Sequence, residues 1–151
     1  MFTFANLREK AGNEIKRLEL AQRQFDSKSA MDHAINAVFS IYCLLDWKEK
    51  TYKPDSKRRA YELCVESNNS ALMMLHDIVS FTKHARVSSS LASTKIEVDS
   101  QNQDEQQIVT PDGRLIVTPD GVRIVVPARV LVKFGDMEAV TVLKHALSEF
   151  E

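Results

Sequence analysis

Apolar residues recur with helical spacing through the first part of the chain. Residues 4–25 place them at every third or fourth position, with charges on the other faces, which is typical of an amphipathic helix. Residues 34–47 are apolar on nearly every face, as expected of a central helix, whereas residues 56–66 are more polar and fit the rim of a bundle. Residues 68–84 start with candidate capping residues and continue with a wide apolar arc. The pattern predicts a four-helix bundle over residues 1–87.

The hydrophobic pattern breaks down between Ser88 and Gln107, where Ser, Thr, Asp, Gln and Glu predominate. Residues 95–99 alternate apolar and polar side chains with period two, which predicts an edge strand. Residues 101–107 contain too few apolar groups to offset the entropy of ordering, so we expect them to be mobile. The segment 88–107 is therefore expected to be a polar linker or an edge strand.

A short repeat follows this segment. The sequence Ile-Val-Thr-Pro-Asp-Gly at residues 108–113 recurs at residues 116–121, and a decayed third copy starts at Ile124. Proline fixes the φ angle that the second position of a type I turn needs, and glycine takes the left-handed conformation of a bulge. The repeat therefore predicts two hairpin turns, with positive φ angles at Gly113 and Gly121.

Two such turns in succession favour an antiparallel β-meander. Three-residue loops would place Ile116 opposite both Ile108 and Ile124, and would align Leu115 with Val109 and Val125 on the other face. Both faces of this meander would be apolar.

The last part of the chain returns to longer elements. Residues 130–134 alternate as a further strand, and Gly135-Asp136 is expected to open a final helix. The predicted fold class is α+β, with an N-terminal four-helix bundle, a small antiparallel β-meander and a C-terminal helix. We expect residues 108–151 to form one compact unit with the bundle. The inward face of the final helix would comprise Ala139, Val140, Val142, Leu143, Leu147 and Phe150.

The composition argues against some classes of protein but does not indicate a specific function. The 151 residues carry a net charge of −1, which argues against a dedicated nucleic-acid-binding protein. Residues 1–92 hold 14 basic and 11 acidic residues, and residues 93–151 hold 6 and 10, so the halves have opposite net charges. Cys43 and Cys64 lie in apolar helical stretches and are expected to be buried and reduced. No signal region or membrane-spanning run is evident, so we expect a cytoplasmic protein.

Asp77 and His84 form the first candidate for chemistry. They are seven residues apart on the predicted fourth helix, so they share a face and are acid–base candidates. The rise of a helix separates them by about 10 Å along its axis, which is too far for both to bind one metal ion without distortion. Basic residues at a helix C-terminus also have an ordinary structural role. We expect no metal site and no cofactor, because the familiar metal and phosphate-loop motifs are missing.

A basic segment is the second candidate. Residues 48–59 hold six basic and two acidic residues together with one tyrosine, so they offer a possible contact for a phosphate backbone. A solvated lysine-rich loop is the simpler interpretation. The candidate residues are Lys48, Lys50, Lys53, Lys57, Arg58 and Arg59.

Short motifs in residues 30–86 resemble a known bundle. The patterns Ala34-x-x-Ala37, Leu45-x-Trp47, Leu72-x-x-Leu75-x-Asp77-Ile78 and Lys83-His84 resemble those of small uncharacterised bacterial and phage-type proteins. Their bundle is similar to that of the HEPN superfamily, whose active members are ribonucleases in toxin and antiphage systems.

The nuclease pattern of that superfamily needs an arginine followed by a histidine after four to six residues. The chain departs from this pattern, because the intervals from Arg23 to His33 and from Arg129 to His145 are both too long. The resemblance therefore implies a fold and not an activity.

Two functions follow as expectations. The first is a non-catalytic binding or assembly module, in a bacterial or phage defence or regulatory system, that forms a homodimer largely through residues 108–134. Another protein is a further candidate partner, nucleic acid is less favoured, and no membrane contact is expected. The alternative is a degenerate or unusual HEPN-like nucleic-acid enzyme that uses Asp77 and His84.

Overall fold

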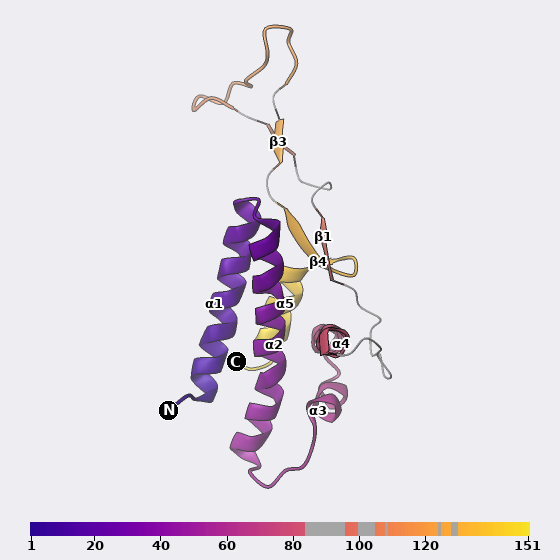
Figure 1. The fold of residues 1–151 in the computed structure, drawn as a ribbon. Coiled ribbons are helices and arrows are strands. Elements are labelled where there is room, and N and C mark those ends of the chain that lie inside the picture. Colours follow the sequence, from indigo (N-terminus) through magenta and orange to yellow (C-terminus); the bar gives the residue numbers. More distant parts are fainter. Residues whose placement is uncertain (84–95, 100–104, 108, 124, 128–129) are drawn as a thin grey trace.

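The structure, a computed structural model, describes residues 1–83, 96–99, 105–107, 109–123, 125–127 and 130–151 (Figure 1). Its helices are α1 Phe4–Arg23, α2 Ser27–Tyr52, α3 Ala60–Ser67, α4 Ser70–Lys83 and α5 Ala139–Ser148. Its strands are β1 Ile96–Asp99, β2 Glu105–Gln107, β3 Val125–Pro127, β4 Leu131–Phe134 and β5 Met137–Glu138.

Side chains cap the starts of three helices. Thr3 and Asn6 form a capping box at α1, with the Asn6 N–H donating to Thr3 Oγ1 at 3.2 Å. Asp26 caps α2, because its carboxylate accepts a hydrogen bond from the Ser29 N–H at 3.0 Å. Asn69 does the same for α4, where its Oδ1 accepts from the Leu72 N–H at 3.1 Å. Asn69 is one of the capping residues that the sequence indicated.

Four helices enclose the hydrophobic core of the helical body, which we define as α1 to α5 with the sheet that packs on them. α1 and α2 lie side by side, and α5 packs against α1, α2 and α4. α3 contacts α2 and α4 from the rim and buries Cys64 alone, as its polar sequence predicts. The prediction for the other cysteine is wrong, because Cys43 is exposed on α2. The largest fully buried apolar side chains are Leu18, Val38, Ile41, Leu44, Leu72, Leu75, Ile78, Val132, Phe134, Val142 and Leu143.

A three-stranded antiparallel sheet lies against α5 in the order β1-β4-β5. β1 is an edge strand, as residues 95–99 predict, and it pairs with β4 so that Ile96 lies opposite Phe134. Gly135 turns the chain with a φ angle of 59°, and β5 then pairs back onto β4. The final helix therefore begins at Ala139, three residues after the predicted Gly135-Asp136 start.

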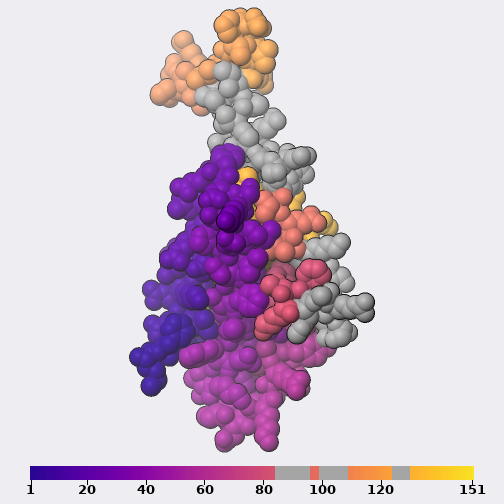
Figure 2. Space-filling view, in the orientation of Figure 1, coloured from indigo at the N-terminus to yellow at the C-terminus, as the bar shows by residue number. Residues whose placement is uncertain are grey.

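The repeat forms a projection that we call the β arm, residues 105–127. β2 and β3 pair antiparallel at its base, and two hairpin fingers, residues 109–115 and 117–123, lie beyond them. Figure 1 shows the two finger tips at the far end of the arm from the helices, and Figure 2 shows the arm standing beyond the end of the body.

The turns of both fingers are confirmed. Gly113 and Gly121 have φ angles of 85° and 82°, in the left-handed region. In the first finger, the Gly113 N–H donates to the Thr110 carbonyl at 2.9 Å, and the Thr110 N–H donates to the Arg114 carbonyl at 2.8 Å. The second finger repeats both bonds between equivalent residues. Each finger is thus a three-residue hairpin loop with a glycine bulge.

The predicted register holds for one pair and fails for another. Val109 pairs with Leu115, as expected. Leu115 does not align with Val125, because Val125 pairs with Gln107 at the base of the arm. Ile108 and Ile124, the other two residues of the predicted ladder, lie outside the described residues. The two fingers are separate hairpins rather than successive strands of one meander.

The α+β class is confirmed, with N-terminal helices, a small antiparallel sheet and a C-terminal helix. The sheet comes from the segments that flank the repeat, and not from the repeat itself. Five of the six predicted inward residues of the final helix are buried, and the sixth, Leu147, packs partly buried against the core. In the part of the chain that the structure describes, no helix is both long enough and apolar enough to cross a bilayer.

Candidate functional site

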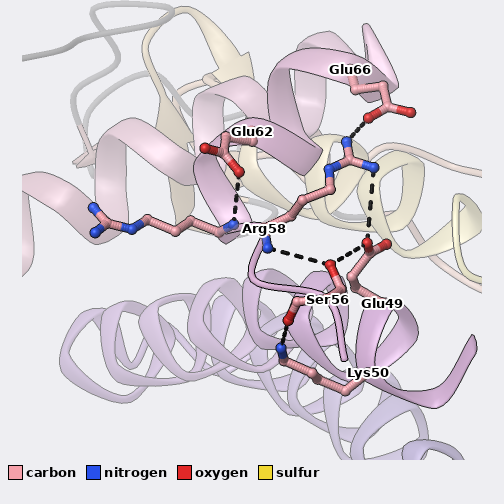
Figure 3. A network of polar contacts seen from close by, with 7 residues as sticks. Glu49, Lys50, Ser56, Arg58, Glu62 and Glu66 are labelled. Carbon is pink, nitrogen blue, oxygen red and sulfur yellow. Dashed lines mark hydrogen bonds and ion pairs between the residues drawn. The ribbon is translucent and has the colours of Figure 1, made fainter. Parts of the chain in front are cut away.

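The basic segment is held in an ion-pair network between α2 and α3 (Figure 3). The Arg58 guanidinium contacts the carboxylate of Glu66 on α3 and lies 3.9 Å from that of Glu49 on α2. Glu49 is buried and also accepts a hydrogen bond from the Ser56 hydroxyl at 2.7 Å. The Ser56 hydrogen bond is the main reason why the pKa of the Glu49 carboxyl lies below its ordinary value. Arg58 is thus engaged by two carboxylates.

Two lysines of the same segment also contact the body. The Lys50 ammonium donates to the Ser56 carbonyl, which fixes the loop that follows α2 (Figure 3). The Lys48 ammonium lies 5.7 Å from the centre of the Phe150 ring and donates to the Glu149 carbonyl at 3.4 Å. Both residues therefore have local structural contacts.

Lys53, Lys57 and Arg59 are exposed, as Lys48 and Lys50 also are. The Arg59 backbone N–H donates to Glu62 at 3.0 Å, which places Arg59 at the start of α3. Of the six candidate residues, Arg58 is the one that the ion pairs of the described residues engage, through Glu49 and Glu66. The geometry therefore gives Arg58 a structural role, and the other five stay candidates for contact with a phosphate backbone.

Asp77 is buried under its neighbours on α4, with 3% of its surface exposed. It lies close enough to Cys64 for its charge to add to the effect of burial, and together these raise the pKa of the Cys64 thiol to about 11. His84 lies outside the described residues, so the prediction that Asp77 and His84 share a helix face stays a prediction. A buried carboxylate next to a thiol kept in its protonated form is not an arrangement for nucleophilic chemistry.

A neighbouring cluster was not indicated by the sequence. The Tyr42 hydroxyl shares a hydrogen bond with His76 Nδ1 at 2.8 Å, and Ser80 Oγ lies 3.4 Å from His76 Nε2. The ring of Tyr61 packs on His76 with 5.2 Å between centroids. Burial raises the pKa of the Tyr42 hydroxyl well above its ordinary value. This cluster joins α2, α3 and α4, and its contacts are those of a packed interface.

Metal binding has no geometric support in the part of the chain that the structure describes, where no three His, Cys, Asp or Glu side chains gather around a common point.

Exposed aliphatic side chains distinguish the β arm from the rest of the molecule. Five of them are 37–61% exposed although aliphatic residues in the body are mostly buried. Neither α5 nor the rest of the body covers these side chains, because α5 packs on β4, below the arm. The five are Val109, Leu115, Ile116, Val117 and Val122. The sequence indicated an apolar surface here, because both faces of the predicted meander were apolar.

Comparisons with known proteins found no matching family model, no matching curated protein and no matching solved structure.

Proposed function

We propose that this protein is a non-catalytic assembly module, in which the helical body holds the β arm out for contact with a second copy of the chain. The observation that carries the proposal is the exposure of five aliphatic side chains on the arm. Exposed aliphatic side chains gathered in one region of a protein are typical of interaction sites.

The backbone of the arm supports the same proposal. Each finger is a two-stranded hairpin with a single described bridge, Val109 with Leu115 or Val117 with Arg123. Short two-stranded hairpins are marginally stable alone in water, and their unpaired edges offer N–H and carbonyl groups to a further strand. Pairing with another chain would bury the aliphatic side chains and satisfy these backbone groups together.

The charge of the arm favours a protein partner over a phosphate-rich one. Residues 105–127 contain three acidic and two basic residues, a net charge of −1. Nucleic acids and anionic membranes attract clustered lysine and arginine, which the arm does not offer. Two arms of nearly zero net charge repel each other little, so we propose a homodimer built largely through residues 108–134. The resemblance to HEPN-like bundles suggests a bacterial or phage defence or regulatory system as its setting.

Light scattering on the full chain tests this proposal. At micromolar concentration we expect about twice the 17.1 kDa mass of one chain. The double variant Leu115→Ser, Val122→Thr removes apolar surface from both fingers and should shift the mass to that of the monomer. Leu20→Gln is the matched control, because Leu20 is 53% exposed on α1, outside residues 105–127, and glutamine keeps its helix propensity.

The two variants give opposite expectations. A dimer in the control and a monomer in the arm variant support the proposal. A monomeric wild-type chain, or a dimer that Leu20→Gln dissociates and the arm variant leaves intact, overturns it.

A further inference from the structure

A cavity of about 320 Å³ opens at the end of the helical body opposite the arm, where α2 ends and the chain turns toward α3. Its apolar lining comes from Leu45 on α2, Leu63 on α3 and Phe150 after α5. Leu45 and Phe150 belong to the hydrophobic core, so the cavity reaches down to that core. Its volume lies at the lower end of the range for sites that bind small molecules, about 300–1,000 Å³.

The acidic groups around this cavity already have partners. Arg58 holds Glu49 and Glu66, as Figure 3 shows. The Glu149 carboxylate accepts a hydrogen bond from Asn69 Nδ2 at 3.1 Å. Because Arg58 and Asn69 already donate to these carboxylates, the carboxylates attract an incoming ammonium group less strongly than free carboxylates would, which disfavours a cationic ligand.

The lysines on the rim of the cavity have weaker contacts than the carboxylates. Lys48 contacts the Phe150 ring and the backbone carbonyl of Glu149, and both contacts are weak for an ammonium group. The ion pairs of the described residues include neither Lys48 nor Lys53, although the charge of Lys53 helps to lower the pKa of the Glu49 carboxyl. Two ammonium groups are therefore available at the mouth of an apolar cavity.

We propose that this cavity binds an apolar group that carries one carboxylate, with Lys48 and Lys53 holding the carboxylate and Leu45, Leu63 and Phe150 surrounding the apolar group. A charge-assisted hydrogen bond from an ammonium to a carboxylate is stronger than a neutral one, and burial of the apolar group supplies the rest of the affinity. Such a group occurs in small aromatic or aliphatic acids and at the C-terminus of a peptide that ends in an apolar residue. The site does not depend on the arm or on self-association.

Titration of the full chain with 3-phenylpropionate, followed by amide NMR, tests the site. We expect saturable shifts at Leu63 and Phe150, with a dissociation constant on the order of 1 mM or below, as suits a ligand of this size. The neutral analogue 3-phenylpropionamide should bind at least about tenfold more weakly, because it lacks the charge. Equal binding of both probes, or no shift at these amides, overturns the proposal.

Three exposed lysines supply matched variants. Lys48→Gln and Lys53→Gln should each weaken 3-phenylpropionate binding by roughly three- to tenfold, since each removes one charged donor. Lys57→Gln removes the same charge from the same segment outside the cavity lining and should change affinity by less than about twofold. If Lys57→Gln weakened binding as much as the other two variants, the effect of charge would be nonspecific. That result would overturn the assignment of Lys48 and Lys53 as the residues that hold the carboxylate.

Peptides distinguish the two sources of the ligand. A tripeptide that ends in phenylalanine is compared with its C-terminally amidated form in the same titration. Binding of the free-acid peptide at the affinity of 3-phenylpropionate or better identifies a peptide C-terminus. Binding of 3-phenylpropionate alone identifies a small acid, and binding of the amidated peptide as tightly as the free acid contradicts the role of the lysines.

Discussion

Aliphatic residues of the same type have opposite environments in the helical body and in the β arm. Ile41 and Val38 on α2 are fully buried, whereas Ile116 and Val117 in the arm are 37% and 46% exposed. In the body, several helices turn their apolar faces to one another. In the arm, each finger is closed by a local turn with no layer packed on it. The body can bury its apolar surface within one chain, and the arm leaves that surface for a partner.

The two regions also differ in how they reverse the chain. The arm places glycine at both of its left-handed turn positions, Gly113 and Gly121. In the body, Gly135 takes such a position between β4 and β5, and the non-glycine residues Phe25 and Asn68 have φ angles of 56° and 51°. A left-handed conformation costs Phe25 on the order of 1–2 kcal/mol, which the packing of the flanking helices can offset, whereas asparagine tolerates it better. Local sequence therefore determines the turns of the arm, while the turn at Phe25 in the body depends on tertiary packing.

The largest expected difference between the regions comes from truncating one isoleucine in each. Ile41→Ala should lower the free energy of unfolding by about 2–5 kcal/mol, because it removes buried methyl groups and leaves a cavity. Ile116→Ala should change it by less than about 0.5 kcal/mol in the monomer. Urea unfolding of both variants, below the concentration at which the chain associates, makes the measurement. Equal losses would show that the arm belongs to the core.

The next largest loss of stability is expected from removing the charge of a buried carboxylate in the body. Glu14 on α1 lies 2.8 Å from His33 Nδ1 and 2.8 Å from the Arg17 guanidinium. Burial on its own raises the pKa of the Glu14 carboxyl, but the hydrogen bond and charge of His33, together with Arg17, bring it below the ordinary value. Because the folded pKa is lowered, this contribution to stability is present above the unfolded value of about 4.5 and is lost as the pH falls below it.

Glu14→Gln should therefore cost about 1–3 kcal/mol at neutral pH and flatten the loss of stability below that pH. Asp120→Asn, the matched change at an exposed carboxylate of the arm, should cost less than about 0.5 kcal/mol. Thermal unfolding from pH 7 to pH 3 compares the two. If the Glu14→Gln variant lost stability toward low pH in the same way as the wild type, the stabilising role of this ion pair would be contradicted.

The smallest effect on the unfolding of the body is expected from a change in a turn of the arm. Gly113→Val forces a β-branched residue to a positive φ angle, at a cost of about 1–3 kcal/mol in the first finger. Its signature is loss of amide protection at Thr110, while the unfolding of the body is unchanged. Gly12→Ala on α1 is the control. It should stabilise the body by about 0.5–1 kcal/mol, since the added methyl group meets Leu147 at an ordinary 4.0 Å.

The sequence predicted the features that depend on near neighbours. Helical periodicity located the buried residues of the final helix, and the motif Pro-Asp-Gly determined the conformations of Gly113 and Gly121. Asn69 was among the expected caps because capping involves only the next turn. In each case the residues that define the structure lie within one or two turns of the chain.

The sequence failed where distant segments determine the outcome. Val125 pairs with Gln107 rather than Leu115, and nothing local distinguishes these two registers. Cys43 lies in a stretch that is apolar on nearly every face but is exposed in the structure. The cavity was missed for the same reason, because its lining runs from Leu45 to Phe150 and is assembled only when α2, α3 and the C-terminal residues meet.

Amide hydrogen exchange at two protein concentrations tests most directly whether the arm is the contact surface. We expect amides of residues 109–123 to exchange more slowly at a high micromolar concentration than under dilute conditions, because association buries the fingers. Amides of the core helices, such as that of Ile41, should exchange equally at both concentrations. Concentration-dependent protection confined to the helices, with exchange in the arm unchanged, would contradict the account.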